Sequence, residues 1–368
     1  MPRTSELLRT TVLLLLAWLP AAAGEPPVPE GMILVPAGDF IMGADDGNYD
    51  EAPAHRVRLS AYYIDRCEVT VAEFAAFVRA AGMVDTVEGP WFRYSVEGCV
   101  DLLAHYERRY GTTAAAFSPP QADGADALRL DADVLRWRAG VAALRVLLGS
   151  DEGLAGQGSA VLAATPRVQE LIHLQAQLPV RGVSWRDAAA FAGRYGKRLP
   201  TEAEWEKAAR GIDGRIYPWG VAWDATRCRA ALDETAGPAP VGSHPSGASS
   251  FGCLDMAGNV WEWCADWYGP ASFQGAEGAV DPTGPPGLSN GELPAQDPGA
   301  KLFRENRQGR ETDTRKVIRG GCWARGAISQ AEFNTRTTRR LWANPGYWAD
   351  DTGFRCAKDA PAAVGGKL

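Results

Sequence analysis

Turn-forming residues recur along most of the chain, and they limit how much regular secondary structure it can form. The 368 residues include 41 Gly and 25 Pro, together with 13 Trp. Glycine and proline interrupt helices and strands, whereas tryptophan supplies a large apolar surface from a single position. This composition is typical of a globular domain that is rich in turns and modest in regular structure.

The first 23 residues have the pattern of a secretory signal peptide. Arg3 and Arg9 precede the apolar run TVLLLLAWLP, and three alanines ending at Ala23 follow it. The run is too short to span a bilayer, and no other stretch of about 18 apolar residues occurs in the chain. We therefore predict cleavage after Ala23, a Pro-rich linker over residues 24–30, and a secreted or periplasmic protein without a membrane span.

The charged residues and histidines exclude some classes of function. The formal net charge is −7, and no Lys/Arg cluster that could follow a phosphate backbone occurs, so nucleic acid is not expected as a partner. The four histidines form none of the spacings HxH, HxxxH or HExxH. The sequence therefore shows no ligand set for zinc or non-haem iron.

The number of cysteines leaves at least one thiol without a partner inside the chain. There are seven, an odd number, and the predicted compartment is oxidising. Cys322 lies in the segment VIRGGCWARG, directly after two glycines. It is either a thiol with a function, half of a disulfide with a neighbour such as Cys356, or a small buried side chain.

Hydrophobic periodicity predicts strands and one helix at the start of the domain. Residues 31–43 contain two short apolar runs around a Pro-Ala-Gly turn, which predicts a hairpin. Val57 and Leu59 alternate with arginines, which predicts a half-buried strand. A helical pattern then begins after Thr70 and stops at Gly82.

The pattern becomes helical over residues 83–177 and then returns to short elements. Two segments of helical spacing, 125–148 and 165–175, are separated by a Gly-rich stretch, so we interpret 83–177 as a helical insertion. Beyond it, Ser184 and Thr201 each precede a helix. Turns and short strands complete the domain to residue 359, and residues 360–368 form a tail.

Seven motifs occur in the same order as in a known protein family. They are MILVPAGDFIMG, EVTVAEFAAFV, PVRGVSWRDAAAFAGRYGKRLPTEAEWEKAARG, YPWG, GCLDMAGNVWEWCADWY, VIRGGCW and TGFRCA. With them, the chain resembles the sulfatase-modifying factor family, whose founding member is the formylglycine-generating enzyme. The resemblance implies one α+β domain over residues 31–359 with a C-type-lectin-like core and little regular secondary structure. It does not cover the insertion.

The copper ligands of that family have no counterpart in this chain. The enzyme converts a substrate cysteine to formylglycine with a copper ion held by two cysteines shortly after a Gly-Gly-Ser segment. The resemblance puts Arg325 or Gly326 at the first of these positions and Gln330 or Ala331 at the second. Copper(I) needs soft thiolate ligands, so we do not expect copper or the known oxidation mechanism.

A calcium site is implied by the segment DMAGNVWE. From the resemblance, Asp255 and Glu262 would give carboxylate oxygens, and Gly258 and Val260 would give backbone carbonyls. Oxygen ligands along one tight turn suit a structural Ca²⁺ ion. The alternative is that the two carboxylates only cap the turn.

The resemblance also implies a substrate groove beside Cys322, which stands where the enzyme has the serine of Gly-Gly-Ser. Trp261, Arg336 and Arg340 would line this groove, and Cys322 is the candidate catalytic residue. A lone thiol with no neighbouring histidine is weak support for nucleophilic catalysis, so its structural alternatives stay open.

Three functions are compatible with these patterns. The first is a divergent maturation factor that acts on an exported protein, a peptide or a natural product. The second is a non-catalytic module that binds a peptide or glycan on the lectin-like fold. A true formylglycine-generating oxidase is the least supported, because the cysteine pair is absent.

Overall fold

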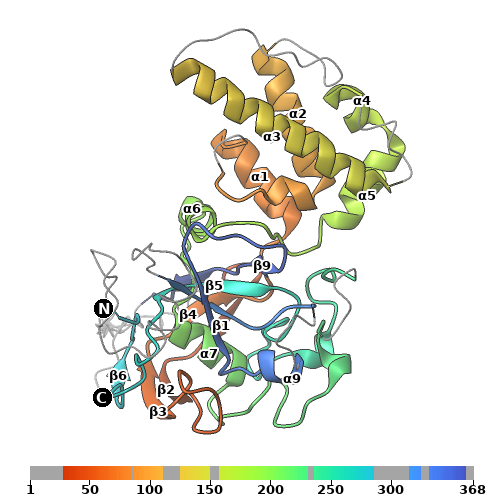
Figure 1. Cartoon of the computed structure of the whole chain (residues 1–368). Coiled ribbons are helices and arrows are strands. Elements are labelled where there is room, and N and C mark those ends of the chain that lie inside the picture. Colours follow the sequence, from red (N-terminus) through yellow and green to blue (C-terminus); the bar gives the residue numbers. More distant parts are fainter. Residues whose placement is uncertain are drawn as a thin grey trace, which may run out of the picture. The chain divides into compact units, whose positions relative to one another are not determined.

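Three small β-sheets form the strand-containing part of the molecule. The computed structural model describes residues 28–84, 87–110, 125–149, 157–230, 236–285, 315–324 and 331–361 (Figure 1). The predicted signal peptide and residues 362–368 of the predicted tail lie outside these ranges. The sheet orders are β1-β4-β10, β2-β3-β6 and β8-β7-β5-β9. The strands are β1 (Met32–Val35), β2 (Gly38–Met42), β3 (His55–Leu59), β4 (Tyr62–Asp65), β5 (Trp261–Trp267), β6 (Ala279–Val280), β7 (Lys316–Arg319), β8 (Arg340–Ala343), β9 (Thr352–Gly353) and β10 (Ala357–Asp359).

The first two strands do not form the predicted hairpin. β1 pairs antiparallel with β4, whereas β2 pairs antiparallel with β3 in a different sheet. Gly38, with a φ of 138°, begins β2 where the chain passes from one sheet to the other. The hairpin prediction over residues 31–43 is wrong because each apolar run finds its partner strand later in the chain. In β3, Val57 and Leu59 are buried and the alternating Arg56 and Arg58 are exposed, as predicted.

Three helices carry the N-terminal caps that the sequence predicts. They are α1 (Val71–Ala81), α6 (Trp185–Arg194) and α7 (Glu202–Arg210). Their N-caps, Thr70, Ser184 and Thr201, each form a capping box with the carboxylate three residues later. Gly82 ends α1 in the left-handed conformation, with a φ of 65°. Shorter helical turns elsewhere are η4 (Ala225–Arg227), η5 (Pro245–Gly247) and α9 (Ala331–Asn334).

Helices occupy the segment that the spacing predicts as a helical insertion. They are η1 (Trp91–Tyr94), α2 (Val96–Tyr110), α3 (Ala125–Leu148), α4 (Ser159–Ala164) and α5 (Pro166–Gln175), and Figure 1 shows the four α-helices grouped together. They enclose an apolar core of their own, which includes Leu102, Tyr106 and Leu144. The segment is tied to α6 because the N–H groups of Glu88 and Gly89 donate to the Asp187 carboxylate.

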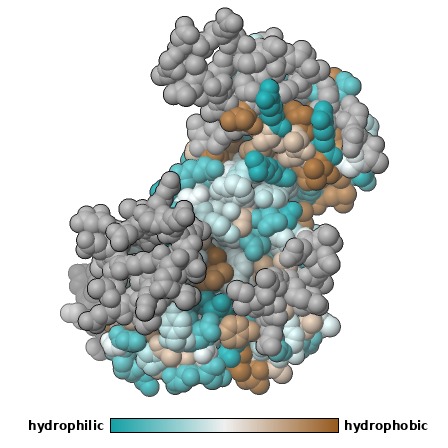
Figure 2. All heavy atoms as spheres, viewed as in Figure 1, coloured by the Kyte–Doolittle hydropathy of each residue, from teal (hydrophilic) through white to brown (hydrophobic). Residues whose placement is uncertain are grey.

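The described surface carries no helix suited to the interior of a bilayer. Leu135, Val146, Val161 and Leu174 are exposed on α3, α4 and α5. Figure 2 shows hydrophobic and hydrophilic residues interspersed on one face. None of the described helices is long and apolar enough to cross a membrane.

Aromatic side chains carry much of the core around β5. Trp261 and Trp263 belong to one apolar cluster with Phe74, Phe191 and Phe354. Cys264, the next residue in β5, belongs to a second cluster that contains Trp205. Successive side chains of β5 point into two different apolar clusters, so the strand is buried on both faces. Large aromatic side chains therefore bury a large apolar surface even in a short strand.

A buried network of arginine and glutamate joins α7 to the sheet that contains β7 and β8. Arg319 donates to Glu202 at 2.9 Å and to Glu206 at 2.6 Å. Arg340 donates to both oxygens of Glu202 at 2.7 and 2.9 Å. All four side chains are buried. Buried charges are tolerated only when they are paired, so each member depends on the others.

We predict that Arg319→Met destabilises the fold by about 3–5 kcal/mol, because it leaves two buried carboxylates with fewer partners. Urea unfolding at neutral pH measures this change. The matched control is Arg58→Met, since the Arg58–Asp39 pair is 64% and 43% exposed. Surface pairs contribute about 0–1 kcal/mol, so a similar loss in both variants would contradict the role of the buried network.

Candidate functional site

Two glycines position Cys322 just beyond the end of β7. Gly320 and Gly321 have φ angles of 99° and 79°. A Cβ atom on Gly321 would lie 2.9 Å from the carbonyl oxygen of Asn334, so a side chain would clash with backbone there. The pair is required because the chain must turn in a left-handed conformation against a close neighbour. This explains why the segment reads RGGC.

The Cys322 thiol lies beside a carboxyl group. Its sulfur is 3.6 Å from Asp351 Oδ2 and 3.7 Å from the carbonyl oxygen of Ala324. Burial, and then the negative charge of Asp351, raises the pKa of Cys322. Burial also raises the pKa of Asp351, and the charge of Asp350 adds to this effect. The thiol is therefore held in its protonated form at neutral pH, which makes it a weak nucleophile.

All seven cysteines are free thiols in the structure. The possible disulfide between Cys322 and Cys356 is therefore not formed. Five of the cysteines are buried, and only Cys67 and Cys322 are half-buried. Cys322 is thus one of two thiols with partial access to solvent, and burial raises the pKa of Cys67 to about 12.

A small aromatic cavity, which we name the Cys322 pocket, opens on the other side of Asp351. Its volume is about 240 Å³, and its lining residues are Trp261, Arg315, Ile318, Leu341, Trp342, Ala343, Asn344, Tyr347, Asp351 and Thr352. Cys322 packs against the apolar cluster that contains Trp261 and Leu341. The structure thus brings Trp261 and Cys322 to one region, where Asp351 both lines the cavity and contacts the thiol, while Cys322 itself is not a lining residue.

The edge of this site extends to the helical insertion. The negative charges of Asp350 and Asp351 act on three nearby side chains, which are Tyr94 of η1, Arg181 and Tyr347. Burial, together with these charges, raises the pKa of both tyrosines. The Arg181 guanidinium carbon lies 5.0 Å from the Tyr94 ring centroid. A residue of the insertion therefore lies within electrostatic range of Asp351, which lines the Cys322 pocket.

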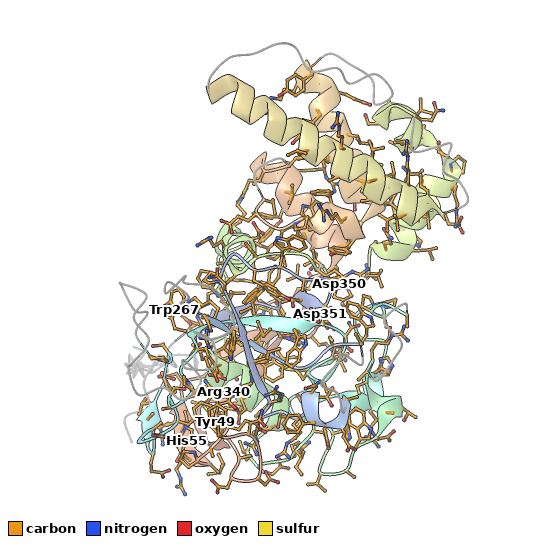
Figure 3. The ribbon with its side chains drawn as sticks, in the orientation of Figure 1. Tyr49, His55, Trp267, Arg340, Asp350 and Asp351 are labelled. Atoms are coloured by element: carbon orange, nitrogen blue, oxygen red, sulfur yellow. The ribbon has the colours of Figure 1, made fainter. Side chains whose placement is uncertain are left out.

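The two arginines assigned to the groove lie elsewhere. Arg340 is 1% exposed, and it pairs with Glu202 in the core. Figure 3 shows it well apart from Asp350 and Asp351. Arg336 pairs with the exposed Asp46 at 2.6 Å. Neither lines the Cys322 pocket, which corrects their placement. The physical reason is that Arg340 neutralises a carboxylate that would otherwise be buried without a partner.

The residues of the implied calcium site lie on the segment that leads into β5, with Glu262 within the strand itself. Asp255 and Gly258 have φ angles of 55° and 82°. However, Arg355 donates to both oxygens of Glu262 at 2.6 and 2.7 Å, and the Trp205 ring nitrogen donates to one of them. A buried carboxylate neutralised by a guanidinium does not fit the role of a cation ligand unless that pair opens. The calcium site stays a prediction.

Glu68 is a buried carboxyl group of this region that the sequence does not single out. It is 3% exposed, and its Oε1 accepts a hydrogen bond of 3.0 Å from Asn259. Among the described residues, Oε2 has no hydrogen-bond partner. Burial, and then the charge of Asp255, raises the pKa of Glu68. Its burial could not be foreseen because the partner residues come from a segment about 190 positions later.

The chemistry of the region after Cys322 does not suit copper. Arg325, Gly326 and Gln330, which stand at the copper positions, lie outside the described residues, and Ala331 begins α9. No cysteine occurs between Cys322 and Cys356 in the sequence. Guanidinium, amide and apolar side chains do not replace the thiolates that copper(I) prefers.

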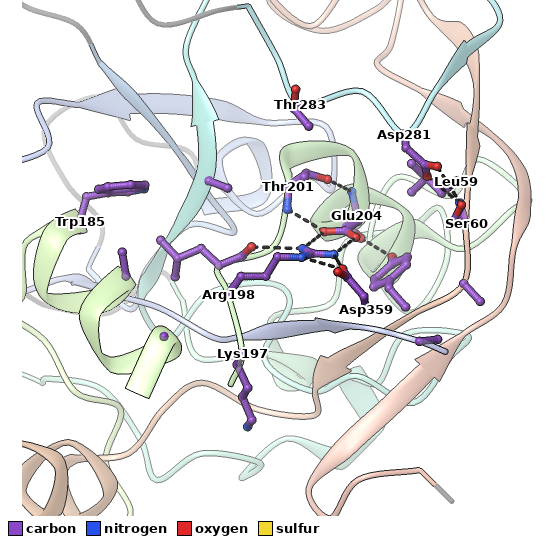
Figure 4. Close-up of a pocket in the computed structure, with 17 residues that line it drawn as sticks. Leu59, Ser60, Trp185, Lys197, Arg198, Thr201, Glu204, Asp281, Thr283 and Asp359 are labelled. Carbon is purple, nitrogen blue, oxygen red and sulfur yellow. Dashed lines mark hydrogen bonds and ion pairs between the residues drawn. The ribbon is translucent and has the colours of Figure 1, made fainter. Parts of the chain in front are cut away.

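A second cavity is larger, and the charged groups at its centre pair with one another. It has a volume of about 620 Å³ and is lined mainly by apolar surface together with Trp185, Arg198 and Glu204. Figure 4 shows Arg198 held between Glu204 and Asp359. Because its central charges satisfy one another, we place the candidate site at the smaller Cys322 pocket, where a thiol and a carboxyl group meet.

We predict that Asp351→Asn speeds alkylation of Cys322 by roughly three- to tenfold at pH 8.5. Removing a negative charge next to the thiol lowers its raised pKa and increases the thiolate fraction. Peptide mapping after timed iodoacetamide labelling measures the rate at each cysteine. Cys67 is the internal control, and its rate should not change. An unchanged rate at Cys322 would mean that Asp351 does not set its ionisation.

Similarity to known proteins covers almost the whole chain. The sulfatase-modifying factor enzyme 1-like domain matches residues 20–360. The formylglycine-generating enzyme of Streptomyces coelicolor is 32% identical over 94% of this chain and 95% of its own. The inactive C-alpha-formylglycine-generating enzyme 2 of Mus musculus is 29% identical over 89% of this chain and 86% of its own. Among solved structures, Treponema denticola variable protein 1 aligns over 90% of this chain and 95% of its own, with 19% identity and a TM-score of 0.49. The chain belongs to the sulfatase-modifying factor family, whose α+β fold it shares.

Proposed function

We propose that this chain is an exported member of the family that binds an extended peptide segment of a protein partner in the Cys322 pocket, without copper-dependent oxidation. The observation that carries this proposal is the environment of Cys322. The thiol is kept protonated and lies beside Asp351, which lines an aromatic cavity. A site of this kind recognises a side chain, but it lacks the paired thiolates of the oxidase.

The size and lining of the pocket favour a peptide side chain as the ligand. A volume of about 240 Å³ is below the 300–1,000 Å³ typical of sites that enclose a whole small molecule. Trp342 and Tyr347 line the pocket, and Tyr347 is 45% exposed. Aromatic residues at the edge of a small cavity are common in interfaces where one side chain of the partner is inserted.

The second candidate is the maturation factor, which would modify an exported protein, a peptide or a natural product. It is favoured by one observation, the free and half-buried thiol of Cys322 at 3.6 Å from a carboxyl oxygen. The raised pKa of the thiol disfavours nucleophilic attack at neutral pH, so we place this function second.

Export rests on the pattern of residues 1–23, and it gives a direct prediction. Expressed from its own gene in a Gram-negative host, the full chain should be recovered from the periplasm or medium with Gly24 as its first residue. N-terminal sequencing of the purified protein measures this. Replacing the apolar run with a polar one should leave the uncleaved chain inside the cell. An unprocessed N-terminus in the wild-type protein would contradict the proposal.

Peptide binding is tested by selecting random 12-residue peptides on the immobilised mature protein. We expect peptides with micromolar affinity that lose at least tenfold on Trp342→Ala or Tyr347→Ala, because an aromatic residue at the centre of an interface contributes about 2 kcal/mol or more. Trp219→Ala is the matched control, since Trp219 is half-buried in a separate aromatic cluster. Selected peptides that bind all variants equally, or no enriched peptide at all, would overturn the proposal.

The absence of oxidase chemistry is tested with the same protein. Cu(I) titration should show no tight binding that depends on thiols, and a cysteine-containing probe peptide should not gain an aldehyde. Tight, thiol-dependent Cu(I) binding or an aldehyde on the probe peptide would instead support a formylglycine-generating oxidase.

A further inference from the structure

The Arg181 guanidinium lies against two aromatic rings and reaches the carbonyl oxygen of Asp350, the residue before Asp351 of the Cys322 pocket. Its central carbon is 5.0 Å from the Tyr94 ring centroid and 5.2 Å from the Trp323 ring centroid. Trp323 is the residue after Cys322, and Tyr94 comes from η1 of the insertion. Stacking on ring faces holds a guanidinium in place through cation–π attraction while its N–H edge stays available for a ligand.

Arg181 differs from the buried arginines of the core in its hydrogen bonding. Arg319, Arg340 and Arg355 each pair with glutamate. Among the described residues, Arg181 forms no ion pair, and its guanidinium makes a single hydrogen bond, 3.5 Å long, to the carbonyl oxygen of Asp350. A guanidinium has five N–H donors. Most of its donor capacity is therefore not used within this part of the chain.

The backbone on both sides of Arg181 is fixed. The N–H of Val180 donates to the Val69 carbonyl at 2.9 Å, and the N–H of Gly182 donates to the Ala349 carbonyl at 2.9 Å. A Cβ atom on Gly353 of β9 would lie 2.3 Å from the carbonyl oxygen of Val180, so β9 packs tightly against the residue before Arg181. The side chain is thus presented from a rigid position, which lowers the entropic cost of binding a ligand.

Nearby charges decide which anion suits this position. Asp350 and Asp351 both interact electrostatically with Arg181, without an ion pair. These carboxylates repel a second negative charge, and they oppose a dianion such as phosphate more strongly than a singly charged group. A carboxylate is planar and singly charged, and it matches the fork of a guanidinium with two parallel hydrogen bonds.

We propose that Arg181 binds a carboxylate of the peptide held in the Cys322 pocket. The inference rests on the proposed function and deepens it, since it names an acidic group as the feature recognised. It also gives the insertion a role, because Tyr94 supplies one of the two rings that hold the guanidinium. The carboxylate comes either from an Asp or Glu side chain or from a chain terminus.

The site itself is tested on the wild-type protein by NMR of the arginine side-chain N–H groups. The probes are N-acetyl-glutamate amide, its neutral glutamine counterpart, and N-acetyl-alanine, which carries a terminal carboxylate. Arg181→Met identifies the Arg181 signal. We expect this signal to move with a carboxylate probe at about millimolar concentration, as for other fragments of this size, and not with the glutamine probe. The two carboxylate probes separate the side-chain and terminal sources. If neither carboxylate probe moves the signal, the inference is overturned.

The peptide assignment is tested with a selected peptide and its Glu-to-Gln or C-terminally amidated version. Wild-type protein should prefer the acidic peptide about tenfold, as expected for a hydrogen-bonded charge pair. Arg181→Met should abolish the preference and Arg181→Lys should restore part of it. Arg58→Met, which removes the same charge from an exposed pair, should leave it unchanged.

The outcomes separate this inference from the proposed function. Peptides that require Trp342 but bind equally with and without the carboxylate would refute the role of Arg181 and leave peptide binding intact. Carboxylate probes that move the Arg181 signal while no peptide binds would leave an anion site and refute its assignment to a peptide.

Discussion

The fold depends on buried pairs of arginine and glutamate, because few hydrogen bonds of regular structure hold its parts together. Arg319 and Arg340 join β7 and β8 to α7 through Glu202, and Arg355 joins the closing segment to Glu262 of β5. Each pair places a charge in the interior, where it is tolerated only with its partner. A chain with short strands and many turns thereby gains long-range connections that are specific in geometry.

These pairs also determine where the functional site can be. Arg340 and Glu262 are each paired in the core, with Glu202 and Arg355. Asp351 lines the Cys322 pocket. Asp350, the next residue, accepts the hydrogen bond of Arg181, which comes from the segment before α6. Because the thiol beside Asp351 is protonated, the site favours binding of a ligand over nucleophilic attack on it. Arg181, whose guanidinium keeps free donors within the described part of the chain, indicates that the bound group is negatively charged.

Local signals in the sequence were reliable wherever the deciding interactions are themselves local. The helix starts predicted at Thr70, Ser184 and Thr201 are confirmed, and all three form capping boxes between residues three positions apart, of which the one at Thr201 was predicted. The predicted hairpin is wrong because β1 and β2 each pair with a later strand, β4 and β3, and not with each other. Arg340 was placed in the groove because an arginine pattern cannot show which carboxylate it meets, and Arg181 was missed for the same reason.

The sequence by itself determined the family, the turn-rich α+β composition and the loss of the copper cysteines, because these depend on which residues occur and in what order. Only the tertiary structure decided the ionisation and the hydrogen bonding of the side chains at the site. Whether Cys322 is a free thiol, what raises its pKa, and which arginine keeps unused donors depend on distances between segments far apart in the chain. Desolvation and charge pairing act through space, so they follow from packing and cannot be read from residue identity alone.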